Sequence, residues 1–164
     1  MKTKKLTLLA MAAALAMILS YLESMIPAFV AIPGIKIGLA NIAVVFVLYR
    51  FGSGEAAVIS LIRVLLVSLV FSLNPGSLFY SLAGAALSLL GMLLLKATRQ
   101  FSPVAVSVTG GVLHNLGQIG MACILLETDV VRYYLPYLIL SGTLAGIVVG
   151  VLAAILVRRI PEGK

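Results

Sequence analysis

Three side chains that could bind a ligand lie close together in an apolar stretch of this 164-residue chain. The 24 residues Pro103–Leu126 carry no charged side chain and are enough to cross a bilayer as a helix. Near their middle stand His114, Asn115 and Gln118. His114 and Gln118 are four residues apart and share one helix face, which Asn115 flanks. Polar groups at that depth indicate a binding site by default, and hydrogen bonding between helices is the alternative.

A single arginine stands inside a second apolar stretch. Arg63 lies near the centre of residues 56–73. A guanidinium cannot become neutral by losing its proton, and placing it in a membrane helix costs about 2.5–3.5 kcal/mol. We interpret Arg63 as a clamp for an anionic or carbonyl-rich ligand. A structural pair with Glu23 or with backbone carbonyls is the alternative.

The composition requires these groups to be held by a membrane protein. The chain is 62% hydrophobic and 10% charged, and its mean hydropathy is +1.20. These values exclude an ordinary soluble domain. We expect one all-α transmembrane domain over residues 1–164, with an irregular capping loop between its first two helices because residues 25–38 hold two prolines and two glycines. The six expected spans are residues 6–22, 39–49, 56–73, 78–95, 103–126 and 133–157.

The basic residues predict how the spans are oriented. Alternate crossing of six spans gathers nine basic residues on one side and only Lys36 and Arg132 on the other. The nine are Lys2, Lys4, Lys5, Arg50, Lys96, Arg99, Arg158, Arg159 and Lys164. The positive-inside rule then puts both termini in the cytoplasm, as expected for a multi-pass protein of a bacterial cytoplasmic membrane. The net charge of +7 is explained in this way without a nucleic-acid partner.

Depth along the spans groups the polar residues. Arg63 lies roughly 13 Å beyond Gly54 and His114 roughly 16 Å beyond Pro103, at similar levels in a core about 30 Å thick. Other polar residues fall toward the outer side, under or within the capping loop. The predicted substrate-binding set is Arg63, His114, Asn115, Gln118, Lys36, Asn41, Tyr80 and Glu23.

The sequence lacks the residues that several kinds of catalysis and metal binding require. No phosphate-binding G-x-x-x-x-G-K-[ST] loop is present, and Asp129 is the only aspartate, so aspartate clusters for magnesium are missing. The sequence also holds no Cys/His metal set and no evident pair of nucleophile and base. We therefore expect no catalytic residues, metal or cofactor, and a protein that binds or carries a molecule.

Small residues predict where helices approach closely. Gly142, Gly146 and Gly150 recur every four residues in the last span, which favours close packing against another helix. In the first span, Ala10 and Ala14 are four residues apart, and so are Ala12 and Ala16. Spacing alone leaves open whether these alanines pack inside the protein or dock a partner.

Four segments carry a resemblance to a known family. They are residues 33–42 (PGIKIGLANI), 61–65 (LIRVL), 80–84 (YSLAG) and 114–118 (HNLGQ). In this order they resemble the small bacterial membrane family called Gx transporters, which is also labelled heptaprenyl diphosphate synthase component I. That family is in turn similar to the substrate-binding S components of energy-coupling factor (ECF) transporters.

The resemblance implies a function and partners. S components have six spans, an outward pocket under the first loop, and an alanine motif that docks a shared transmembrane subunit; Ala10 and Ala14 fit this motif. We therefore expect uptake of a vitamin-like, aromatic or anionic molecule, driven by partner ATPases. Two alternatives stay open. One is a non-catalytic membrane accessory subunit of heptaprenyl diphosphate synthesis, and the other is a stand-alone carrier in which His114 relays protons.

Overall fold

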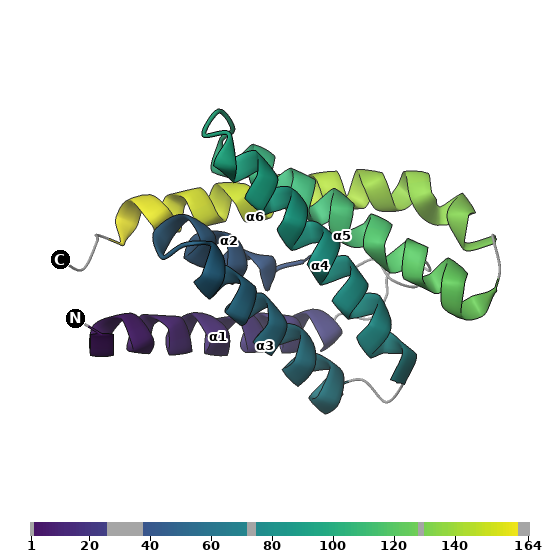
Figure 1. Cartoon of the computed structure of the whole chain (residues 1–164), viewed down its shortest axis with the longest axis horizontal. Helices are drawn as coiled ribbons and strands as arrows, with labels where there is room; N and C mark the ends of the chain where they lie inside the picture. The colour runs from purple at the N-terminus through teal and green to yellow at the C-terminus, as the bar shows by residue number, and fades with distance from the viewer. Residues whose placement is uncertain (1, 26–37, 72–74, 128–129, 161–164) are drawn as a thin grey trace.

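A computed structural model describes residues 2–25, 38–71, 75–127 and 130–160, all in helices and short connections without a β-strand (Figure 1). The α-helices are α1 (Lys2–Met25), α2 (Asn41–Arg50), α3 (Ser53–Phe71), α4 (Pro75–Ala97), α5 (Pro103–Leu126) and α6 (Leu135–Arg159). A 3-10 helix, η1 (Val130–Tyr134), precedes α6. The predicted all-α membrane architecture is confirmed, and the predicted bounds of the fifth span coincide with those of α5.

Five of the helices are long and apolar enough to cross a membrane, and α2 is the exception. Its 10 residues rise only about 15 Å, half of a hydrocarbon core. Residues Ile42 to Leu48 of α2 are all buried, as expected for a helix that is apolar all round and enclosed by others. The expected second span is therefore too short to cross a membrane by itself, and α2 instead forms a central element of the bundle.

The helices fall into two groups, α1 to α3 and α4 to α6, that meet along α3 and α4 and also along α2 and α6. α5 packs along much of its length against α4 on one side and α6 on the other. α2 contacts α1, α3 and α6, and it contributes more buried side chains to the principal apolar core than any other helix. The seam between α3 and α4 is much less extensive than the contacts of α5 with its two neighbours.

Glycines allow α5 to approach its neighbours closely. A Cβ atom at Gly111 would lie 2.6 Å from the carbonyl oxygen of Gly142 on α6. A Cβ at Gly117 would lie 2.6 Å from the carbonyl oxygen of Ala83 on α4. Backbone atoms cannot yield like a flexible side chain, so these positions require glycine. The predicted packing face on α6 is confirmed, and α5 is the helix against which it packs.

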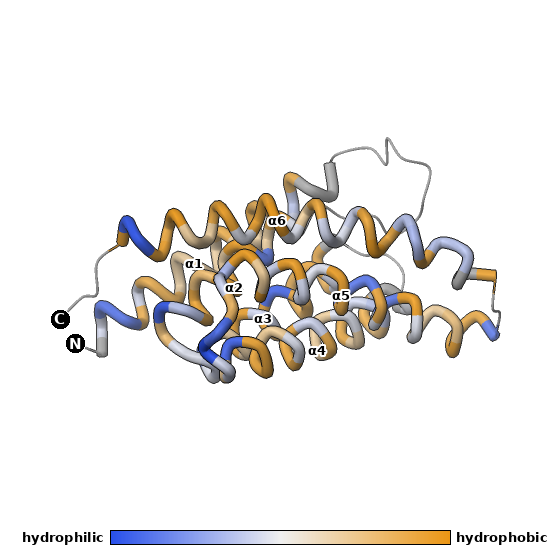
Figure 2. The backbone as a smooth tube through the Cα atoms, turned by 90° about the horizontal axis from the view of Figure 1, so that it is seen from above, coloured by the Kyte–Doolittle hydropathy of each residue, from blue (hydrophilic) through white to orange (hydrophobic). Residues whose placement is uncertain are grey.

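One end of the bundle holds both termini and most of the basic residues. Figure 1 shows the two termini at this end, and Figure 2 shows hydrophilic residues there with hydrophobic ones along the helices. Lys5 of α1 forms an ion pair with Glu55 of α3. The Lys96 ammonium of α4 donates a hydrogen bond to the carbonyl oxygen of Leu48 in α2. These contacts join four helix ends that the predicted alternate crossing places on one side. The orientation of the helices in a membrane stays a prediction. We call this the basic end.

Candidate functional site

Arg63 lies on the inward side of α3. Ile59, one turn before it, is only 3% exposed, whereas Leu61 on the opposite side of the helix is 51% exposed. Arg63 itself is half-buried and takes part in an interaction within the structure. A guanidinium keeps its charge in such surroundings, so this position provides a permanent cation inside the bundle.

His114 and Gln118 lie together against α4. A Cβ atom at Gly84 would stand 3.0 Å from His114 Cε1 and 2.9 Å from Gln118 Cγ. Both side chains are half-buried, and His114 also has an interaction partner in the structure. The predicted sharing of one helix face by these two residues is confirmed. The absence of a side chain at Gly84 provides the space that they occupy.

Asn115 is directed to the other neighbour of α5. Its amide nitrogen donates a 2.7 Å hydrogen bond to the carbonyl oxygen of Leu138 on α6, and the residue is 6% exposed. Successive helix residues differ in direction by about 100°, which separates Asn115 from His114. The expectation that all three polar groups turn to one cavity is therefore not met by Asn115. Its amide nitrogen makes the inter-helix bond that was the alternative interpretation.

Three predicted residues lie at one level above the basic end. Arg63 is ten residues from the start of α3, roughly 15 Å along the axis, and His114 is roughly 16 Å from the start of α5. Asn41 begins α2, roughly 14 Å from its basic end at Arg50. Asn41 is half-buried, and its backbone N–H donates a 2.8 Å hydrogen bond to the carbonyl oxygen of Gly38. The beginning of α2 thus lies at a depth similar to that of Arg63 and His114.

The other predicted binding residues are placed less fully. Tyr80 is half-buried on α4, one turn farther from the basic end than Gly84. Lys36 and the predicted capping loop lie outside the described residues. Glu23 is in the last turn of α1, but its side chain is not among those described. The role of these residues at a ligand stays a prediction.

The two alanine pairs of α1 face in opposite directions. Ala12 and Ala16 are 6% and 0% exposed and belong to the apolar core. Ala10 and Ala14 are exposed on the outer side of the helix. The structure therefore separates two pairs that spacing alone could not, and it leaves the Ala10–Ala14 face accessible within this chain.

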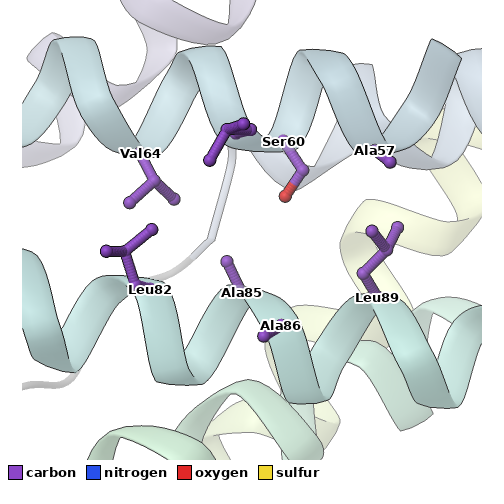
Figure 3. Close-up of a pocket in the computed structure, with 8 residues that line it drawn as sticks. Ala57, Ser60, Val64, Leu82, Ala85, Ala86 and Leu89 are labelled. Carbon is purple, nitrogen blue, oxygen red and sulfur yellow. The ribbon is translucent and has the colours of Figure 1, made fainter. Parts of the chain in front are cut away.

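A cavity of about 120 Å³ lies between α3 and α4. Figure 3 shows Val64 opposite Leu82, Ser60 near Ala85, and Ala57 toward Leu89. Arg63 and His114 do not line it. Sequence reasoning missed this cavity because small residues signal either close packing or a gap, and only the neighbouring helix decides which. We call it the α3–α4 groove.

The predicted site residues that are described offer hydrogen-bond donors and acceptors and, in Arg63, an inward cation away from the basic end. Within the described ranges, no three His, Cys, Asp or Glu side chains are grouped closely enough to hold a metal ion. Arg63 can bind an anionic or carbonyl-bearing group, and His114 and Gln118 offer hydrogen-bonding groups at a similar height on α5. Among the described residues α3 is not in contact with α5, so the structure does not bring Arg63 against these two side chains.

Comparison with known proteins identifies the family of the chain. Residues 12–156 match the family described as heptaprenyl diphosphate synthase component I. No curated protein and no solved structure is significantly similar to the chain. The family match covers most of the sequence, including every long helix in whole or large part. The chain therefore belongs to the heptaprenyl diphosphate synthase component I family.

Proposed function

We propose that this protein is a membrane-embedded binding subunit that takes up a small anionic or aromatic molecule with the help of partner ATPases. The observation that carries the proposal is the half-buried Arg63 at the level of half-buried His114 in a bundle of apolar helices. A charge is costly at that depth, and its retention is typical of a ligand pathway or site.

The ligand is recognised by the chemistry of these side chains. The Arg63 guanidinium presents a planar set of donors that suits a carboxylate, a phosphate or a pair of carbonyl groups. His114 and Gln118 add donors and acceptors from α5, and we include the half-buried Asn41 and Tyr80 in the proposed set. Lys36 and Glu23 complete the proposed set from the first connection. Asn115 positions α5 against α6, because its amide nitrogen bonds Leu138.

Native mass spectrometry of the purified full chain tests for a retained small molecule. Once the molecule is identified, its affinity is measured for Arg63→Gln and Gln118→Ala. We expect at least a roughly tenfold loss for Arg63→Gln, because a charge-assisted hydrogen bond contributes about 1.5–3 kcal/mol. Thr143→Val is the control, since Thr143 bonds only within α6 and is exposed. Unchanged affinity in both site variants would rule this site out.

The exposed alanine pair of α1 supports docking of a transmembrane partner. Small residues at Ala10 and Ala14 allow another helix to approach, and leucine at both positions would prevent this. We expect Ala10→Leu/Ala14→Leu to abolish co-purification with the ECF transmembrane and ATPase subunits, while Ala10→Ser/Ala14→Ser retains it. Co-purification that survives the leucine variant would remove the docking proposal.

The family description favours a second candidate. A subunit of heptaprenyl diphosphate synthesis would use Arg63 at a diphosphate and would work beside a soluble prenyl synthase. Affinity purification of the tagged full chain from a bacterial membrane distinguishes the two functions. Recovery of ECF ATPases supports uptake, and recovery of a prenyl synthase in their place supports the accessory subunit.

A further inference from the structure

The α3–α4 groove is an apolar recess along a seam that is much less extensive than those of α5 with α4 and α6. Its α3 wall includes Ala57, Ser60 and Val64, and its α4 wall includes Leu82, Ala85 and Leu89 (Figure 3). The recess holds about 120 Å³, and Leu61 at its edge is 51% exposed. In a membrane, that exposed edge faces hydrocarbon. The groove therefore suits several methylene groups of an alkyl chain and offers almost nothing to a polar ligand.

A positive charge stands beyond one end of the groove. Lys96 follows Leu89 by seven residues, which places it two turns closer to the basic end on the same side of α4, about 10 Å farther along. The Lys96 ammonium donates to the carbonyl oxygen of Leu48 and lies 5.5 Å from the ring centre of Tyr49. In the described part of the chain, it has no carboxylate within ion-pair distance. Its charge is thus not neutralised by a carboxylate of the described residues.

The apolar groove and the Lys96 ammonium are arranged so that one could hold the acyl chain of a membrane lipid and the other its anionic head group. We propose that the α3–α4 groove holds one acyl chain of an anionic phospholipid whose phosphate lies beside Lys96 at the basic end. The 10 Å between Leu89 and Lys96 corresponds to the glycerol and the first methylene groups. This inference is separate from the proposed uptake, because it uses neither Arg63 nor His114.

Lipid retention by the purified full chain tests the proposal. The protein is equilibrated in mixed micelles with equal amounts of phosphatidylglycerol and phosphatidylcholine, and native mass spectrometry counts the lipids that remain. We expect one phosphatidylglycerol per chain, favoured about fivefold over phosphatidylcholine, as for one lysine near an anionic head group. Lys96→Gln should abolish this preference, whereas Arg159→Gln, which removes an exposed charge of α6, should keep it.

Substitutions that fill the groove distinguish an acyl chain bound there from a general attraction of lipids to the charge of the protein. Ala85→Leu and Ser60→Val, on opposite walls, should each lose the retained lipid. Gly120→Leu adds bulk where a Cβ meets no atom within 4 Å, and it should retain the lipid. Equal retention of the two lipids by the unaltered chain, or an unchanged lipid count in both filled variants, would overturn the proposal. If farnesyl diphosphate is added to the same micelles and is retained in preference to phosphatidylglycerol, the proposal is also overturned.

Discussion

Asn115 of α5 donates a 2.7 Å hydrogen bond from its amide nitrogen to the carbonyl oxygen of Leu138 on α6. The bond depends on a glycine, because a Cβ atom at Gly142 would stand 2.8 Å from the same nitrogen. A polar side chain inside an apolar bundle is thereby satisfied by the backbone of the neighbouring helix. The stripe of small residues on α6 therefore permits both close packing and this hydrogen bond.

Removal of the Asn115 amide should weaken the bundle without affecting its fold. We expect Asn115→Ala to lower the free energy of unfolding by about 1–2 kcal/mol, through the lost inter-helix bond and the space left behind. Thermal unfolding in detergent can be followed with a thiol-reactive dye at Cys123, the only cysteine. Thr143→Val should change stability by less than about 0.5 kcal/mol, as an exposed site does. Equal losses in the two variants would contradict an inter-helix role for Asn115.

Two glycines of α5 should respond in opposite ways to alanine. Gly111→Ala places a Cβ against a backbone oxygen of α6, and overpacking of this kind costs about 1–3 kcal/mol. Gly120→Ala meets no atom within 4 Å and should be neutral or slightly stabilising, because alanine favours helix more than glycine does. The same dye assay compares their melting temperatures. A stable Gly111→Ala variant would mean that α5 and α6 are farther apart.

The ends of the long helices could be predicted to within about four residues, because hydropathy and turn residues mark them. The expected span 103–126 and helix α5 share their bounds, and the Ser102 side chain that accepts from the N–H of Ala105 caps the beginning. The depth of Arg63 and His114 followed from the same bounds. The five-residue helix η1 was not predicted, because its sequence has neither a long apolar run nor a turn motif.

Hydropathy and turn residues could not predict which helices pack against each other. His114 and Asn115 are adjacent, yet one lies against α4 and the other bonds α6, and no local pattern says which helix stands on which side. The alanine pairs of α1 show the same limit. Ala10 and Ala12 differ in exposure only because α1 packs on α2 and α3 with one side. Helix contacts of this kind depend on the whole bundle.

The ion pair between Lys5 and Glu55 should contribute little to stability. Its side chains are 47% and 26% exposed, and ion pairs in contact with water contribute little. We expect a double-mutant cycle with Lys5→Gln and Glu55→Gln to give a small coupling energy that decreases as salt is added. A coupling energy that salt does not change would indicate a pair shielded from water, contrary to its exposure.

Labelling of single cysteines should show on which side of the membrane the basic end lies. In a Cys123→Ala background, cysteine replaces Arg99 or Arg159 at the basic end, and Glu127 at the opposite end of α5. Since basic ends stay in the cytoplasm, we expect a membrane-impermeant maleimide to label position 127 in intact cells. Positions 99 and 159 should react only in inside-out vesicles. The reverse pattern would place Lys96 and both termini outside, and the retained phospholipid would then belong to the outer leaflet.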